Sequence, residues 1–274
     1  MEAKLQKIAQ KEAAEKEKAA GRPSVKAGGW IQADWALFGQ GTASRGVYGD
    51  VQDGVEFRRA RIFLKGEAFH VIDYKIEMDF ADTDTGSGPT EAVYDGAGNQ
   101  LVDAGGDPVE VVTSTKTIQS TAFKDVYITV KELPHVGHVR VGHFKEPFGL
   151  EYLTSTRFIT FMEGSLGGEY AFVPGRRMGV MAFDTWAGQR GTWAIGAFRS
   201  EQTNGSEPPF RMDDDGGTAV TMRTTFLPWY DEASGGRGVL HTGIAYSYRD
   251  IDDGTVRLRA RPEAHLAPYV VDTH

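Results

Sequence analysis

Basic side chains alternate with apolar side chains in two stretches of the sequence. The basic members are Arg59, Arg61, Lys65 and Arg140. In an extended chain, Ile62 and Leu64 fall on the opposite face from the first three, and Val139 and Val141 lie opposite the fourth. A guanidinium keeps its charge at any workable pH and presents a fork of donors that fits phosphate or carboxylate. Several such groups along a water-filled wall would concentrate anions and pass them from site to site.

The same basic residues could instead pair with acidic neighbours. The acidic residues expected on the same face are Asp73, Glu77 and Asp79. Such pairs would brace the wall rather than contact a solute. Walls of pores normally mix both roles, so the sequence leaves both interpretations open.

Metal and catalytic chemistry have little support in the sequence. His135, His138 and His143 are separated by odd intervals, so neighbouring imidazoles would point to opposite faces of a strand. The acidic runs at 82–86 and 213–215 lack the glutamate that completes an EF-hand loop. No nucleophile elbow, Walker loop or HExxH motif is present. We therefore predict no metal, no cofactor and no enzymatic activity.

From Gly28 onward apolar residues recur at every second position, which is the pattern of a β-strand. We therefore expect strands to position these residues. The predicted strands are 30–38, 56–69, 72–81, 123–133, 137–144, 177–185, 191–200, 219–227, 239–249 and 256–260. Their usual length of about 9–13 residues suits a tilted membrane-spanning strand better than the ~5–6 residues typical of soluble sheets.

Short and long connections alternate along the chain. The short ones are 70–71, 134–136 and 186–190, and the long ones are 39–55, 82–121, 145–176 and 201–218. This rhythm is typical of a transmembrane barrel, with tight turns at one end and long loops at the other. Aromatic residues that suit an interfacial girdle lie near the short connections, at Phe69, Trp186, Trp229 and Tyr230.

Composition narrows the remaining classes. The chain has 274 residues and no cysteine, which excludes disulfides and thiolate metal sites. Its net charge of −8 argues against nucleic acid as a partner. Residues 1–21 are strong helix formers without the apolar region of a signal peptide, so we expect a helical leader or a coiled-coil remnant there. We assign residues 28–274 to a partial barrel.

The connection 145–176 is too polar for a core and too aromatic for a tail. A connection of roughly 30 residues is uncommon in a compact domain and usually has a function. We predict that it folds into the lumen of a barrel.

Six motifs in order along the chain resemble one known family. They are EFRRARI at 56–62, YKIEMDFA at 74–81, AFKDVY at 122–127, VRVGHFKEPF at 139–148, LTSTRFITFME at 153–163 and PGRR at 174–177. Together they resemble the phosphate- and polyphosphate-selective porins of the O/P type. The resemblance implies an all-β, antiparallel transmembrane β-barrel of about 16 strands in the bacterial outer membrane. It further implies a homotrimer, an inward-folded third loop and passage of small anionic solutes along lumen arginines.

In that family the third loop forms the narrowest point of the pore. By position Ser155, Thr156 and Arg157 would lie there and donate to an oxyanion. Where phosphate-selective members carry flanking basic residues, this chain has Tyr152 and Gly164. The resemblance therefore implies a more general anion pore. About ten strands are too few to close such a barrel, so the chain is expected to be a fragment or a truncated product.

Two other classes remain open. A soluble all-β binding or adhesion domain of the cell envelope would give a similar alternation of polar and apolar residues. An outer-membrane enzyme would need a nucleophile, and Ser155 is the one candidate that the sequence offers for it.

Overall fold

The computed structural model describes residues 23–81, 83–86, 90–92, 110–112, 116–119, 122–166, 173–199, 217–250 and 258–273. The predicted helix at 1–21 and the acidic run at 213–215 lie outside these residues.

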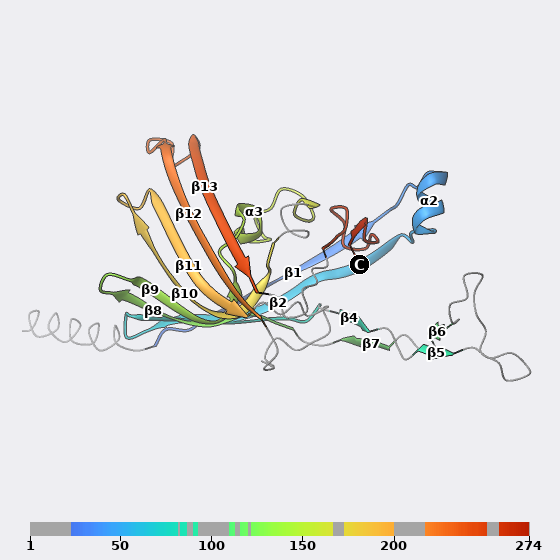
Figure 1. The fold of residues 1–274 in the computed structure, drawn as a ribbon, viewed down its shortest axis with the longest axis horizontal. Helices are drawn as coiled ribbons and strands as arrows, with labels where there is room; N and C mark the ends of the chain where they lie inside the picture. The colour runs from blue at the N-terminus through green and yellow to red at the C-terminus, as the bar shows by residue number, and fades with distance from the viewer. Residues whose placement is uncertain are drawn as a thin grey trace, which may run out of the picture.

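The described residues form nine antiparallel strands in one curved sheet, with the order β1-β2-β3-β8-β9-β10-β11-β12-β13 (Figure 1). The strands are β1 (Lys26–Ala36), β2 (Gly54–Ala68), β3 (Ile72–Asp79), β8 (Ala122–Leu133), β9 (Gly137–Lys145), β10 (Arg176–Trp186), β11 (Gly191–Arg199), β12 (Thr218–Tyr230) and β13 (Val239–Arg249). This arrangement confirms the all-β, antiparallel prediction. Within the described part of the chain β1 and β13 are the two edges, and the sheet is not closed.

Smaller elements lie in the connections. They are the helices α2 (Thr42–Tyr48) and α3 (Leu150–Leu153), and the strands β4 (Thr83–Gly86), β5 (Thr90–Ala92), β6 (Glu110–Val112), β7 (Lys116–Gln119), β14 (Arg259–Ala260) and β15 (Val271–Asp272). β4 pairs with β7 and β5 with β6, so the long connection between β3 and β8 contains two short ladders. Among the described residues, no helix is long and apolar enough to span a membrane.

Two strand predictions differ from the structure, and a proline explains one of the differences. The described part of the strand predicted at 256–260 contains β14, which pairs with β15 outside the main sheet, and residues 256 and 257 lie outside the described residues. The strand predicted to end at 227, before Pro228, runs on to Tyr230. A register shift between Phe226 and Trp229 leaves the proline outside the ladder, where its missing N–H costs nothing.

The sheet is apolar on its exposed face and polar on its covered face. Ile31, Trp35 and Ile244 are each more than 70% exposed, whereas Glu77 and Thr129 are 2% exposed. A soluble sandwich has the opposite arrangement, with apolar side chains inside. A broad exposed apolar face is typical of strands whose outer side contacts lipid.

The tight turns lie at one end of the strands and the long connections at the other, as the alternating lengths predict (Figure 1). The β2–β3 turn is unusual because Phe69 and His70 both have positive φ, at 54° and 62°. Residues with this backbone are usually glycine or asparagine, since a Cβ is strained in the left-handed region. The turn therefore stores strain at two non-glycine residues.

Replacing His70 by glycine should relieve part of this strain. We expect His70→Gly to raise the free energy of unfolding by about 0.5–1 kcal/mol, measured by urea denaturation of the refolded protein in detergent. His241→Gly is the matched control, because His241 is exposed within β13 and has no positive φ. That control should lower stability. A loss of stability in both variants would contradict the interpretation.

Candidate functional site

A β-bulge puts two adjacent arginines on the covered face. Gln32 of β1 pairs with Arg59 of β2, but the next residue, Ala33, pairs with Phe57, so Arg58 has no partner in the ladder. An extra residue of this kind bends the strand and re-aims side chains. Arg58 and Arg59 consequently both reach the same cavity.

The sequence interpretation overlooked Arg58, although a signal for it was present. Phe57 and Ile62 are both apolar and both exposed. Because they are an odd number of residues apart, strict alternation cannot place both on one face. A bulge between them was therefore required.

The segment after β9 turns inward, which confirms the predicted inward loop. Pro147 ends the strand, and Gly149, with φ of 73°, turns the chain into α3. Figure 1 shows α3 on the concave side of the sheet. We call residues 146–166 the inner loop.

Two buried glutamates fasten the inner loop at its ends. At the beginning, Glu146 accepts hydrogen bonds from Thr221 Oγ1 at 2.6 Å and from Arg249 Nη2 at 2.7 Å. Near the other end, Glu163 forms ion pairs with Arg58 and, at 3.0 Å, with Arg59. Neither carboxylate side chain is exposed. The loop is thus held by β12 and β13 on one side and by β2 on the other.

A partly exposed carboxylate organises the middle of the loop. Glu151 accepts hydrogen bonds from the backbone N of Ser165 at 2.8 Å and from its Oγ at 2.5 Å. These bonds lower the pKa of the Glu151 carboxyl below its usual range. The contact therefore contributes at neutral pH and is lost as the pH falls through the lowered pKa.

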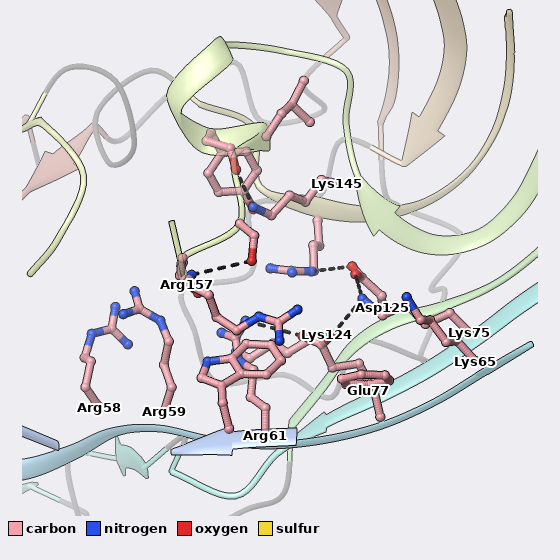
Figure 2. Close-up of a pocket in the computed structure, with 17 residues that line it drawn as sticks. Arg58, Arg59, Arg61, Lys65, Lys75, Glu77, Lys124, Asp125, Lys145 and Arg157 are labelled. Carbon is pink, nitrogen blue, oxygen red and sulfur yellow. Dashed lines mark hydrogen bonds and ion pairs between the residues drawn. The ribbon is translucent and has the colours of Figure 1, made fainter. Parts of the chain in front are cut away.

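The inner loop and the first strands enclose a basic cavity of about 370 Å³ (Figure 2). Its cationic side chains are Arg58, Arg59, Arg61, Lys65, Lys75, Lys124, Lys145, Arg157 and Arg176. Its carboxylates are Glu77 and Asp125. Glu163 and Asp79 lie just behind the lining and pair with it. Five positive charges remain in excess after all four acids are counted.

Most of these cations have carboxylate partners. Arg61 bonds to Asp79 at 2.6 Å and to Glu77 at 3.3 Å. Lys75 and Arg176 share Asp125, at 2.6 and 2.7 Å. Asp73, which the sequence suggested as a partner for the inward arginines, instead forms an ion pair with Lys131, with 3.0 Å between Oδ1 and Nζ. Arg59 and Arg61 are therefore both ion-paired.

Two cations of the cavity have no carboxylate partner among the described residues. The Arg157 guanidinium lies 5.0 Å from the ring of Trp30, and the Lys65 ammonium lies 5.7 Å from the ring of Phe63. Both side chains are exposed. Ser155 and Thr156, the other loop residues singled out from the sequence, line the same cavity.

The structure separates Arg140 from the other predicted site residues. Its guanidinium lies 3.9 Å from the ring of Tyr127, in a second cavity of about 470 Å³. Tyr152 belongs to the basic cavity, with its ring 4.4 Å from Lys145 Nζ, while Gly164 is buried and lies outside the lining.

Two further observations complete the site. His265 of the C-terminal segment lies 2.9 Å from Glu56 on β2, and burial, together with the nearby Arg58 cation, lowers its pKa although Glu56 opposes this. Among the residues that the structure describes, no group of three His, Cys, Asp or Glu side chains could hold a metal ion.

Comparison with known proteins relates the chain to porins, in agreement with the antiparallel sheet and the inner loop. Residues 25–271 match a family model described as phosphate-selective porin O and P. The chain is also similar to Porin O of Pseudomonas aeruginosa, with 28% identity over 245 residues, which cover 87% of this chain and 44% of that protein. The chain thus spans less than half the length of this relative. The family match confirms the resemblance seen in the sequence motifs.

Glu163 should decide whether the inner loop stays in place. Glu163→Gln removes the carboxylate partner of the buried Arg59 and weakens the ion pair of the half-buried Arg58. Removing one partner of a buried ion pair typically costs about 3–5 kcal/mol. We expect the loop to detach and trypsin to cleave after Arg157 at least about tenfold faster, as measured by mass spectrometry on refolded protein.

Glu151→Gln is the matched control in the same loop. Its carboxylate is partly exposed and bonds only to Ser165 in the described structure, so cleavage should change much less. Equal cleavage of the two variants would show that Glu163 does not fasten the loop.

Proposed function

We propose that this chain functions as part of a pore, because it belongs to the phosphate-selective porin O and P family. Membership indicates a channel rather than an enzyme. We infer that the sheet forms part of a barrel wall in the bacterial outer membrane, and that small anionic solutes diffuse passively along its covered face. In agreement with the family resemblance, we expect the complete pore to be a homotrimer.

The observation that carries this proposal is the charge excess of the basic cavity. The chain as a whole has a net charge of −8, so its surface would repel anions. The cavity nevertheless holds nine cations and two carboxylates in its lining. A local excess in a low-dielectric cleft raises the concentration of the opposite ion there. The wall is therefore suited to small anions and not to cations.

The cations that have a carboxylate partner and those that have none suggest two roles, bracing of the wall and contact with the solute. Arg59 and Arg61 are neutralised by carboxylates, so they brace the wall and shape its field. Lys65 and Arg157 have no carboxylate partner in the described chain, so we assign direct solute contact to them. The hydroxyls of Ser155 and Thr156 line the same cavity and would add hydrogen bonds to an oxyanion.

We propose general anion passage rather than tight phosphate selection. Tight binding of phosphate needs several unneutralised donors around one anion. In the basic cavity Tyr152 supplies a ring to Lys145 in place of a further charge. A weakly binding wall also lets the solute leave, which conduction requires.

The main rival is a soluble envelope domain that binds a ligand. The exposed apolar face argues against it, because Ile31, Trp35 and Ile244 would contact water in such a protein. A membrane places lipid at this face, so the porin function explains both faces of the sheet.

Reversal potentials in planar bilayers under a KCl gradient test the proposal. We expect channels that the refolded full chain forms in the bilayer to pass chloride in preference to potassium. Combined Lys65→Gln and Arg157→Gln should lower the chloride-to-potassium permeability ratio by about twofold or more, because two unpaired charges leave the cavity. Arg190→Gln is the control, since Arg190 pairs with Glu232 near the turns, 3.0 Å away.

The possible outcomes separate the alternatives. Cation selectivity in the unmodified protein would retain a pore and reject the basic cavity as its selective element. Protein that inserts as a closed barrel and passes no current would favour the binding domain.

A further inference from the structure

The second cavity has a different lining from the basic cavity. Its lining includes four aromatic residues, which are Tyr127 on β8, Phe144 on β9, Phe183 on β10 and Trp193 on β11. Two guanidiniums also reach it, from Arg140 on β9 and Arg223 on β12. The two cavities adjoin, because Asp125, Lys145 and Leu153 line both. We call the second one the aromatic cavity.

Arg223 is the unexplained group of this cavity. It is half-buried, and in the described part of the chain its side chain has no hydrogen bond, ion pair or ring contact. Its neighbours in register are Ala194 on β11 and Ala245 on β13, which offer no acceptor. A partly desolvated guanidinium without an acceptor is costly.

The polar neighbours of Arg223 on the same strand are already engaged. Thr221 donates to Glu146 at 2.6 Å, and Thr225 shares a hydrogen bond of 2.6 Å with Thr192. Glu146 in turn is held by Arg249. The acceptor that would satisfy Arg223 must therefore come from outside these residues.

Arg140 presents a second open guanidinium edge. Its guanidinium lies over Tyr127 at 3.9 Å, with the rings of Phe183 and Phe144 at 5.1 and 5.5 Å. Its Nε donates to Thr129 Oγ1 at 3.0 Å, and this is its one hydrogen bond within the described structure. The two terminal nitrogens are thus oriented by the rings and remain available as donors.

Phe183 lies between the two guanidiniums. It contacts Arg140 directly and is in register with Ala194, which is in register with Arg223. β9 and β12 are three strand spacings apart, about 14 Å along a sheet. This distance is larger than the diameter of a small inorganic anion. A ligand whose ring packs on Phe183 can instead place an attached anionic group next to Arg223.

The charge balance of the aromatic cavity favours a monoanion. Its cations are Arg140, Lys145 and Arg223, and its carboxylates are Asp184 and Asp125, which also pairs with Lys75 and Arg176 of the basic cavity, so the positive excess is small. A doubly charged, strongly hydrated phosphate would lose water against the aromatic walls without full compensation. A carboxylate is planar, carries one charge and fits the fork of a guanidinium.

We propose that the aromatic cavity is a second solute site, which binds aromatic carboxylates with the ring on Phe183 and the carboxylate on Arg223. This inference rests on the proposed function, because a solute would arrive through the adjoining basic cavity. Arg140 supplies a second donor edge beside the ring. The site would extend the range of solutes that the pore accepts from small inorganic anions to anions with a flat apolar body.

Binding of benzoate to the refolded full chain in detergent tests this site, with acetate as the probe that lacks a ring. By isothermal titration calorimetry, we expect benzoate to bind at least about fivefold more tightly than acetate. Arg223→Gln should weaken benzoate by about tenfold, and Arg223→Lys should weaken it less, since it keeps the charge and loses the fork. Phe183→Leu should weaken benzoate and leave acetate unchanged.

Arg190→Gln serves again as the control, and far-UV circular dichroism shows that each variant is folded. If Arg223→Gln does not fold, Arg223→Lys and Phe183→Leu still decide the question. Equal affinity for benzoate and acetate in the unmodified protein overturns the proposal. Benzoate affinity that is unchanged in Arg223→Lys, Arg223→Gln and Phe183→Leu overturns it as well.

The calorimetric result is independent of the proposed function, because binding in detergent needs no current. Benzoate binding without chloride current in bilayers would reject the pore and keep the site. Chloride current without selective benzoate binding would keep the pore and reject the site.

Discussion

The placement of the inner loop depends on one buried carboxylate between two adjacent arginines. Arg58 and Arg59 both face inward only because of the bulge in β2, and two neighbouring guanidiniums without a counter-charge would repel each other. Glu163, more than a hundred residues later in the sequence, supplies that counter-charge. Because a buried charge needs its partner, the bulge, the arginines and the loop depend on one another.

The remaining acids of the wall are distributed in a way that keeps the cavity basic. A wall whose cations were all paired could not attract an anion, and a wall with none paired would be destabilised by its own repulsion. Here Glu77, Asp79 and Asp125 neutralise cations on β2, β3 and β10. Lys65 and Arg157 lie against aromatic rings and have no carboxylate partner among the described residues. We therefore propose that the bracing and guiding roles, which the sequence left open, fall to different residues.

Features set by local backbone geometry could be predicted from the sequence, whereas contacts between distant residues could not. The strands and the inward direction of Arg59 and Arg61 could be inferred from a period of two, because that period is a property of extended backbone. The partner of Arg59 could not be found in this way, since no local pattern links β2 to Glu163. Arg58 was missed because alternation was assumed to continue through a bulge. Arg140 was grouped with the other arginines, although β8, β9 and β10 place it among aromatic rings.

The aromatic side of the wall reverses the usual arrangement of a pore, in which apolar residues face lipid. Phe144, Met181 and Phe198 form a buried cluster on the covered face, with Phe144 1% and Phe198 2% exposed. Burial there stabilises the sheet without the help of lipid, since it removes apolar surface from water inside the structure. Of these rings, Phe144 also lies 5.5 Å from the Arg140 guanidinium. A guanidinium binds an anion more strongly in such surroundings than in bulk water, so the packing that stabilises this side of the sheet would also strengthen anion binding at the site that we propose.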